Sequence, residues 1–367
     1  MINRKKILIV VGTRPNFIKI TQFPDLFKAH ANRFSLKIIH TGQHFDDKMS
    51  KIFFQQFGFG PDVILPIDTA TPTTQMAHIM LGLEKIFTEE SPDLVVVVGD
   101  VNSTAATALT ANKMNIRVAH VESGLRSFDR TMPEENNRII TDHIADYFFI
   151  TEQSGMDNLL KEGKTTDQIF FVGNTMIDTM VAFRSQINSS DVLKKLNVEE
   201  KKYVLMTMHR PATVDSLDGL TKLIDLTREI SKKYKIVFPV HPRTLKSIND
   251  FGLNEQLLGN NNLIITDPLD YFSFQKLIKE CKFIITDSGG IQEESTFLGI
   301  PCLTLRPNTE RPSTILTGTN ELMPFSVAGI QNKIKEIEEG RFKKGSTPPF
   351  WDGKTTQRIV EILLKIA

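Results

Sequence analysis

The sequence predicts an α/β protein built from two doubly wound, Rossmann-like domains that face each other across a cleft. Three observations favour this class: short apolar runs alternate with longer amphipathic stretches, the runs fall into two sets, and each set spans about half of the 367 residues. Continuous apolar strands that alternate with helices are typical of parallel sheets covered on both faces. A chain of this length also exceeds one typical hydrophobic core, which favours two domains.

The elements follow in order along the chain. The first set of apolar runs predicts strands at Ile7–Val11, Leu36–Ile39, Leu94–Val98, Val118–Val121, Phe148–Ile150 and Ile169–Val172. The second set predicts strands at Val204–Met206, Ile236–Val240, Leu263–Ile265, Phe283–Ile285 and Cys302–Leu305. Helices are expected over 73–90, 102–114, 133–146, 217–233 and 271–281.

The domain boundary is expected near Gly173 and Asn174, where the first set of strands ends. This gives a first domain over 1–173 and a second over 174–353. A last helix, Thr355 to Ile366, lies in the segment 354–367, and we expect it to pack back onto the first domain.

Composition and charge argue against several classes of protein. A formal net charge of +1 disfavours a general nucleic-acid binder. The two cysteines form no C-x-x-C pair, which argues against a disulfide framework or a cysteine-based zinc site. No apolar run approaches the ~18 residues of a membrane span, and Ile7–Val11 is too short for a signal peptide. We therefore expect a cytoplasmic protein that binds neither membranes nor nucleic acid.

The informative positions follow the strands, because ligands of open parallel sheets bind beyond the carboxyl ends of the strands. These positions are rich in His, Asp, Glu and Arg, whereas the runs before them contain almost none. This placement predicts an enzyme. The first turn has only Gly12, so the dinucleotide motif G-x-G-x-x-G is absent, as are G-x-x-x-x-G-K-[ST] and G-x-S-x-G. A nicotinamide enzyme of the usual kind is therefore disfavoured.

A candidate anion site lies in the second half, at the stretch TDSGGIQEES. Two glycines at a strand-to-helix junction allow a phosphate to approach free main-chain N–H groups. Arg311 adds a cation that can grip a phosphate with two donors. Glu294, about one turn into the helix, could accept bonds from ribose hydroxyls. The alternative is a tight turn with Ser288 as helix N-cap and Glu294 as a solvated acid. The combination predicts a bound nucleoside diphosphate.

Candidate acids lie in the first half. Asp100, Glu122 and Glu134 each fall at a strand end or in the adjoining helix start, and could serve as general base and acid on carbon-bound protons. A metal site is an alternative, although hard-cation sites usually group their oxygen ligands more tightly. For Glu134, a second alternative to a catalytic role is a surface ion pair with Arg138. For Glu135 we favour the interpretation of a plain surface acid at a helix N-terminus.

Three histidines directly follow strands and are candidates for substrate contact or catalysis: His44, His209 and His241. His209, which precedes Arg210, could bond a diphosphate or assist its departure. The other histidines considered are expected to be structural, namely His30, His40, His78 and His143.

With these residues assembled, the chain resembles the non-hydrolysing UDP-N-acetylglucosamine 2-epimerase family. The likeness runs in order along nearly the whole chain, through GTRPNFIK (12–19), TGQH (41–44), GDVNST (99–104), HVESGLRS (120–127), MPEENNRIITDH (132–143), VGNTMID (172–178), HR (209–210), FPVHPR (238–243), TDSGGIQEES (286–295) and NTERP (308–312).

The resemblance implies two Rossmann-like domains of the glycosyltransferase-B type and a homodimer that uses no cofactor and no metal. The family interconverts UDP-GlcNAc and UDP-ManNAc by removing the proton at sugar C-2 and expelling UDP. A 2-acetamidoglucal forms, and UDP then adds back with protonation on the opposite face. The product would supply a surface polysaccharide.

The resemblance also implies residue roles. The implied acid/base residues are Asp100, Glu122 and Glu134, with His209 acting around diphosphate departure. Ser288, Gly289 and Gly290 would bind phosphate. Glu294 would bind the ribose, and Phe274 would lie near the uracil. The charged or polar parts of the substrate would be bound by Arg14, Lys19, Arg138 and Arg311. In some bacterial members Gln43, His44 and their neighbours form a second, activating UDP-GlcNAc site.

Two departures from the family pattern concern the first turn and the second site. Asn16 and Phe17 stand where many members have Glu and Ala, and Asp46 changes the neighbourhood of the second site. The stretch TGQHFDDKMS is also similar to relatives that epimerise UDP-2,3-diacetamido-2,3-dideoxyglucuronate. The remaining alternatives are a glycosyltransferase of the same architecture, a hydrolysing epimerase and a sugar-nucleotide sensor without turnover.

Overall fold

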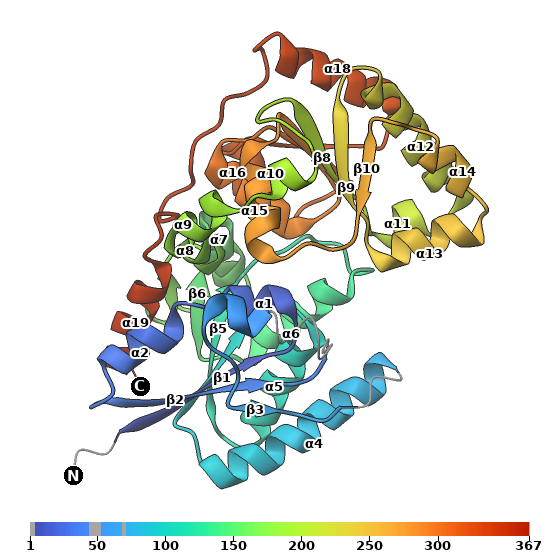
Figure 1. Cartoon of the computed structure of the whole chain (residues 1–367). Helices are drawn as coiled ribbons and strands as arrows, with labels where there is room; N and C mark the ends of the chain where they lie inside the picture. The colour runs from blue at the N-terminus through green and yellow to red at the C-terminus, as the bar shows by residue number, and fades with distance from the viewer. Residues whose placement is uncertain (1–3, 44–52, 68–70, 367) are drawn as a thin grey trace. The chain divides into compact units, whose positions relative to one another are not determined.

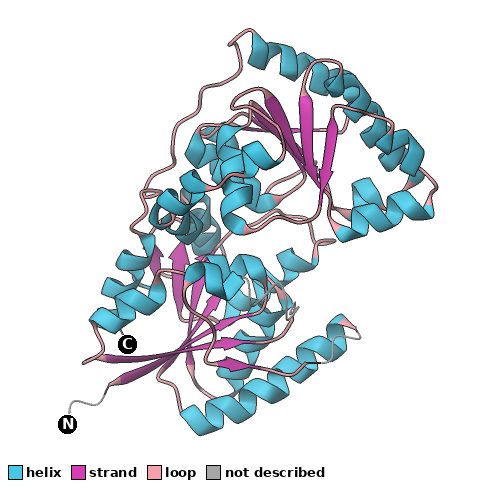
Figure 2. Cartoon of the chain, viewed as in Figure 1, coloured by secondary structure: helices cyan, strands magenta, loops and turns pink. Residues whose placement is uncertain are grey.

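The structure is a computed structural model that describes residues 4–43, 53–67 and 71–366. The chain forms two compact units. Unit 1 comprises Met1–Ala182 together with Pro349–Ala367, and unit 2 comprises Phe183–Pro348. Each unit is a parallel sheet with helices on both faces, as the sequence predicts for the fold class (Figures 1 and 2).

Unit 1 contains a parallel sheet with the strand order β3-β2-β1-β4-β5-β6-β7. Its strands are β1 (Lys5–Val11), β2 (Phe34–His40), β3 (Val63–Ile64), β4 (Leu94–Val98), β5 (Arg117–Ser123), β6 (Tyr147–Ile150) and β7 (Ile169–Phe171). Its helices are α1 (Arg14–Ile18), α2 (Phe23–Ala29), α4 (Pro72–Glu90), α5 (Asn102–Lys113), α6 (Pro133–Ile144), α7 (Gln153–Lys161), the 3₁₀ turn η1 (Thr166–Gln168), α8 (Thr175–Ala182) and α19 (Thr355–Ile366).

The centre of this sheet is apolar throughout. All five residues of β4, sequence LVVVV, are buried, and β4 pairs in parallel with β1 on one side and β5 on the other. Because the three strands run in parallel, their carboxyl ends reach the same edge of the sheet. Arg14, Asp100 and Glu122, which lie at or just beyond these strand ends, are therefore at that edge.

The segment after unit 2 returns to unit 1. Helix α19 packs against α2 and α8, and Figure 1 shows it beside α2. The indole N–H of Trp351 donates to the main-chain oxygen of Thr151 over 2.9 Å. Buried Asp178 accepts bonds from the main-chain N–H groups of Thr355 and Thr356, at 3.0 and 2.5 Å, at the start of α19.

Unit 2 contains a parallel sheet with the order β10-β9-β8-β11-β12-β13. Its strands are β8 (Tyr203–Thr207), β9 (Lys235–Pro239), β10 (Leu263–Thr266), β11 (Phe283–Thr286), β12 (Cys302–Leu305) and β13 (Asn320–Met323). Its helices are α9 (Arg184–Ser189), α10 (Val192–Lys195), α11 (Pro211–Val214), α12 (Leu217–Ser231), α13 (Pro242–Asp250), α14 (Asn254–Leu258), α15 (Tyr271–Glu280), α16 (Gly289–Leu298), α17 (Pro312–Leu316) and α18 (Val327–Glu338).

The order of this sheet explains the position of the double-glycine stretch. Strand β11 pairs with β8 and β12, and α16 begins three residues after β11 ends. Apolar clusters from the helices and strands of unit 2 form its own core on both faces of the sheet.

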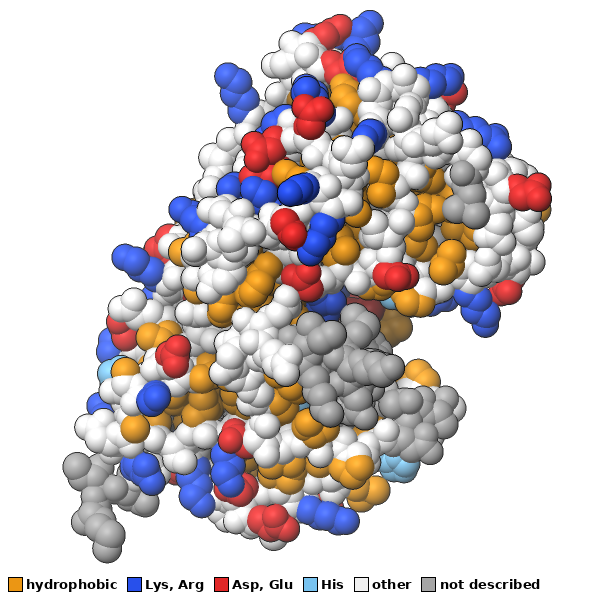
Figure 3. Space-filling model, viewed as in Figure 1, with side chains coloured by type: hydrophobic (Ala, Val, Ile, Leu, Met, Phe, Trp, Pro, Cys, Tyr) orange, Lys and Arg blue, Asp and Glu red, His pale blue; other side chains and the backbone are white. Residues whose placement is uncertain are grey.

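The surface carries charges of both signs. On the face shown in Figure 3, Lys and Arg side chains are interspersed with Asp and Glu side chains, as the net charge of +1 leads one to expect. No helix in the described part of the chain is both long enough and apolar enough to span a bilayer.

Candidate functional site

In unit 1, the first turn is held against the end of β4. The Asn16 amide donates to the main-chain oxygen of Val98 over 3.0 Å, and Thr13 Oγ1 donates to Asn16 Oδ1 over 2.8 Å. Gly99 has φ +68°, and a β-carbon there would lie 3.0 Å from Asn16 Nδ2 and 3.4 Å from Lys19 Nζ. Glycine at position 99 therefore lets the ammonium group of Lys19 approach the strand end that leads to Asp100.

Glu122 lies at an irregular point in β5. Its φ is +71°, and the pairing of β5 with β6 shifts register between Val121 and Ser123, as in a β-bulge. A bulge redirects a side chain, and a left-handed non-glycine residue costs on the order of 1–3 kcal/mol. The carboxylate so aimed forms an ion pair with Lys19, and both side chains are buried.

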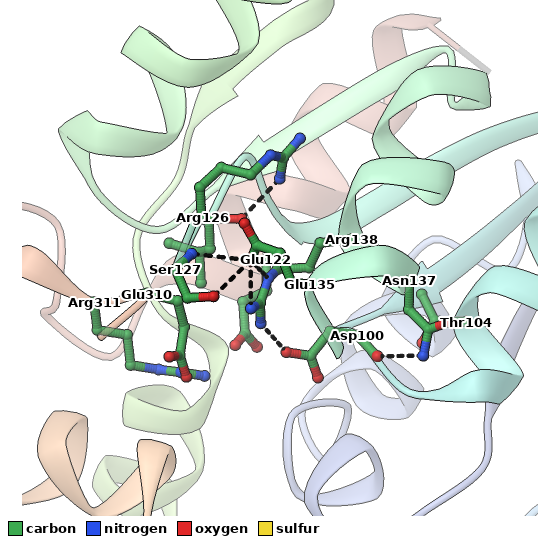
Figure 4. Close-up of polar contacts among 12 residues, drawn as sticks. Asp100, Thr104, Glu122, Arg126, Ser127, Glu135, Asn137, Arg138, Glu310 and Arg311 are labelled. Atoms are coloured by element: carbon green, nitrogen blue, oxygen red, sulfur yellow. Dashed lines mark hydrogen bonds and ion pairs between the residues drawn. The ribbon is translucent and has the colours of Figure 1, made fainter. Parts of the chain in front are cut away.

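Arg138 joins two carboxylates. Its guanidinium forms an ion pair with the half-buried Asp100, and its Nε and Nη2 donate to Glu135 Oε2 over 3.1 and 2.7 Å (Figure 4). The main-chain N–H groups of Ser127 and Phe128 also donate to the Glu135 carboxylate, each over 2.9 Å. Burial alone would raise the pKa of Glu135, but the bonds from Ser127 and Arg138 bring it below its usual value.

The interpretation of Glu135 as a surface acid is wrong. Its side chain is 1% exposed, and it ties the loop after β5 to α6. The neighbouring Glu134 is exposed on the first turn of the same helix. The two adjacent acids therefore have different tasks: Glu135 is built into the structure, whereas Glu134 presents its carboxyl group to solvent.

The other predicted residues of unit 1 lie at the same sheet edge. The buried Gln43 accepts bonds from Ser103 at the start of α5, at 2.9 Å from the main-chain N–H and 2.6 Å from Oγ. The guanidinium of Arg14 stands 5.1 Å from the ring centre of Phe53. His44 lies outside the described residues.

In unit 2, the start of α16 has the features of an anion site. Ser288 occupies the N-cap position, so the first main-chain N–H groups of the helix follow it. A β-carbon on Gly289 would lie 2.8 Å from Glu310 Oε1 and 2.9 Å from Arg311 Nη1. The Arg311 guanidinium thus packs directly against Gly289, and it forms ion pairs with Glu293 and Glu310.

His209 is oriented by a buried acid. Its Nδ1 lies 2.7 Å from Asp287 Oδ1, and its own N–H and that of Arg210 donate to Asp287 Oδ2 over 2.9 and 2.8 Å. Burial alone would raise the pKa of Asp287, but the bonds from His209 and Arg210 bring it below its ordinary value. The His209 side chain is 41% exposed, and its ring lies 5.8 Å from that of His241. The sequence places Asp287 among the informative positions after a strand but gives it no role of its own.

The remaining residues of unit 2 flank α16 or line its neighbours. The amide of Gln275 on α15 donates to the buried carboxylate of Glu294. Phe274, also on α15, packs partly buried against a core cluster of the unit. His241 caps α13, where its Nδ1 accepts from the N–H of Arg243 over 3.2 Å. Within residues 4–43, 53–67 and 71–366, no three His, Cys, Asp or Glu side chains are arranged to hold a metal ion.

The fold and these sites define a class: a two-unit Rossmann-like protein with carboxylates at the strand ends of one unit and, in the other, a glycine-containing helix start next to an arginine. The comparison with known proteins identifies the family within this class. Residues 28–364 match the family described as UDP-N-acetylglucosamine 2-epimerase. The chain belongs to this family, as the motifs predicted.

Individual relatives cover almost the whole chain. A UDP-N-acetylglucosamine 2-epimerase of Methanococcus maripaludis is 40% identical over 364 residues, covering 98% of each chain. A UDP-2,3-diacetamido-2,3-dideoxy-D-glucuronate 2-epimerase of Pseudomonas aeruginosa is 35% identical, covering 98% of this chain and 100% of that one. The crystal structure of the Methanocaldococcus jannaschii UDP-GlcNAc 2-epimerase with UDP-GlcNAc and UDP has a TM-score of 0.88, at 39% identity and coverage of 98% and 99%.

Proposed function

We propose that the protein interconverts UDP-GlcNAc and UDP-ManNAc by inverting carbon 2 of the sugar. The observation that carries the proposal is the membership of the family over residues 28–364, at 40% identity to a relative named for this substrate. The side chains at both sheet edges support it, because they supply the two things that the reaction needs: acids for a carbon-bound proton and donors for a departing diphosphate.

The anion site of unit 2 would hold the UDP group. Main-chain N–H groups after Ser288 and the positive end of α16 stabilise phosphate charge, and Arg311 adds two further donors. Glu294 would accept from the ribose hydroxyls, and Phe274 would lie near the uracil. His209, oriented by Asp287, would donate toward the phosphate oxygen that carries the leaving charge. Stabilising that charge favours cleavage of the sugar–phosphate bond.

The acids of unit 1 would act on the sugar. A carboxylate among Asp100, Glu122 and Glu134 takes the proton from C-2, and the C–H electron pair forms a double bond between C-1 and C-2. The bond from C-1 to the phosphate oxygen breaks, and its electron pair leaves with UDP. In the return step the same oxygen attacks C-1, and an acid protonates C-2 on the opposite face. Lys19 and Arg14 would contact polar parts of the substrate.

Arg138 has a different place in this proposal from the one that the motif match implied. It is 1% exposed and contacts Asp100 and Glu135. We propose that it fixes the Asp100 carboxylate toward the sugar rather than binding the sugar itself. Gln43 and His44 stay with the second, activating site that the resemblance implies. The homodimer, the cytoplasmic location and the supply of a surface polysaccharide belong to the same proposal.

The second candidate substrate is UDP-2,3-diacetamido-2,3-dideoxyglucuronate, which the 35% identical Pseudomonas aeruginosa relative favours. Both substrates undergo the same chemistry at C-2, so the reaction does not distinguish them. Residues 44–50 of the stretch on which the likeness rests lie outside the described part of the chain.

Proton NMR in deuterium oxide tests the proposal. The protein is incubated in parallel with UDP-GlcNAc and with the diacetamido-uronate, without any acceptor. We expect loss of the C-2 proton signal and appearance of the C-2 epimer with one of them. A glycosyltransferase would leave both substrates unchanged, a hydrolysing epimerase would release free ManNAc and UDP, and a sensor would bind UDP with no exchange at C-2.

A further inference from the structure

A buried pair formed by one histidine and one aspartate contacts the segments that carry the proposed acids of unit 1. His120 is in β5 and Asp142 is in α6, and the side chains of both are fully buried. His120 Nδ1 lies 2.6 Å from Asp142 Oδ1, and His120 Nε2 lies 2.8 Å from the main-chain oxygen of Gly99. Neither residue was singled out from the sequence, although both fall within the matched stretches.

Both nitrogens of this ring face acceptors. A carbonyl oxygen can only accept, so Nε2 must carry a hydrogen, and a carboxylate can only accept, so Nδ1 must carry one too. The second oxygen of Asp142 accepts from the N–H of Gly124 over 3.0 Å and contacts Arg126 Nη1 at 2.7 Å. Two donors at this oxygen, one of them cationic, stabilise the ionised carboxylate.

The charges around the ring agree with this assignment. Burial alone would raise the pKa of Asp142, but His120 and Arg126 hold it below its ordinary value. Arg126 also bonds both oxygens of Glu162, at 2.9 and 2.7 Å. With His120 charged, the cluster of His120, Arg126, Asp142 and Glu162 contains two cations and two anions. Lys164, half-buried, adds a cation near Asp142.

The pair joins the three segments that carry the proposed acids. Gly99, whose carbonyl accepts from His120, immediately precedes Asp100. His120 and Gly124, which both bond Asp142, stand two residues before and two residues after the left-handed Glu122. Asp142 belongs to α6, which also carries Glu134.

We infer that His120 is held as a doubly protonated imidazolium, and that with Asp142 it acts as a positioning pair for Asp100, Glu122 and Glu134. It touches no reacting atom in this assignment. The positioning role depends on the proposed epimerase reaction, whereas the protonation of the ring does not. Two measurements separate these parts.

The protonation is measured by NMR of the full chain with ¹⁵N-labelled histidine. The chain has eight histidines, and the His120 signals are those lost in His120→Gln. We expect both ring nitrogens to carry a hydrogen at pH 7, because each faces an acceptor. A bare nitrogen on this ring at pH 7 would overturn the assignment. In Asp142→Asn the ring loses its counter-charge, so one of its nitrogens should lose its hydrogen at pH 7; an unchanged ring would also overturn the assignment.

The positioning role is measured by C-2 exchange in deuterium oxide with the substrate that the wild type turns over. We expect kcat to fall about 100-fold in His120→Gln and Asp142→Asn, with the Kd for UDP changed less than threefold. His143→Gln, an exposed histidine on the same helix, is the matched control and should keep its rate. Rates equal to the control would overturn the positioning role. No exchange by the wild type would instead refute the proposed function and leave the NMR result standing.

Discussion

A β-carbon at position 289 would lie within 3 Å of both Glu310 Oε1 and Arg311 Nη1. These atoms are the buried ends of an ion pair, so they have little room to withdraw. The glycine therefore sets how close the guanidinium comes to the start of α16. A shift of a single residue matters in α6 too, where the exposed Glu134 directly precedes the buried Glu135.

The first prediction concerns Gly289. In Gly289→Ala the new methyl group must push Arg311 away from the helix start, so the Kd for UDP should rise at least tenfold, about 1.4 kcal/mol. Isothermal titration calorimetry measures it. Gly329→Ala is the control, because a β-carbon there meets nothing closer than 3.5 Å. Equal affinities of the two variants would show that UDP does not use this turn.

The second prediction concerns Glu135. Glu135→Gln leaves Arg138 and the loop amides without their shared anion, and should cost roughly 3 kcal/mol at pH 7 in urea unfolding. The folded pKa of Glu135 is depressed, so its stabilisation is present above the unfolded pKa of about 4.3 and is lost as the pH falls through the lower folded value. The difference between wild type and variant should therefore shrink toward pH 3.

Glu134→Gln is the control for that measurement, since the side chain is exposed on the same turn. It should change the unfolding midpoint little at any pH. A stability loss in Glu135→Gln that is independent of pH would contradict the electrostatic explanation.

Among the elements, those built from continuous apolar runs could be predicted. The helix expected over 73–90 is α4 at Pro72–Glu90, and β4 coincides with its predicted bounds. Strand β13 was missed, because its buried Asn320 is satisfied by hydrogen bonds rather than by apolar contacts: Thr304 donates to it over 2.6 Å, and it donates to Gln292 over 3.1 Å.

The position of a candidate residue in the fold could be predicted where it comes shortly after a strand, as Asp100 does two residues beyond β4. The burial of Glu135 could not be predicted. Neighbouring helix positions point about 100° apart, and the loop after β5, which Glu135 contacts, has no periodic pattern that would show which position it covers. Nor does a sequence reveal the left-handed backbone of Glu122, which depends on the register of β5 against β6.

The third prediction concerns helix α19. Asp178→Ala removes the acceptor at the start of this helix and should cost about 1–2 kcal/mol. Trp351 is the single tryptophan of the chain and is buried in the same segment, so its emission reports release of the segment. We expect the thermal midpoint of this emission to fall by several degrees. Asp167→Ala, at an exposed aspartate of unit 1, should leave it unchanged.

At the scale of the whole molecule, each unit has its own sheet and its own core. Unit 2 is one continuous stretch of sequence, whereas unit 1 consists of the two stretches that precede and follow it in the sequence. In the proposed function the division of labour follows the units: one holds the nucleotide and the other supplies the acids.

The fourth prediction tests this division. Residues 183–348, produced alone, should fold and bind UDP with a Kd within about tenfold of the full chain, because every proposed UDP contact lies in this stretch. They should show no exchange at C-2. Calorimetry and circular dichroism measure binding and folding. A folded fragment without UDP affinity would mean that unit 1 supplies necessary nucleotide contacts.

The return of Trp351 and α19 to unit 1 has a consequence for biosynthesis. The ribosome completes the whole of Phe183–Pro348 before it makes the segment that covers α2 and α8. Domains fold as units during synthesis, so the middle of the chain can reach its native state while the half begun earlier still awaits its final helix. Under the proposed function, the newborn protein would thus be able to bind a nucleotide before the unit that supplies its acids is complete.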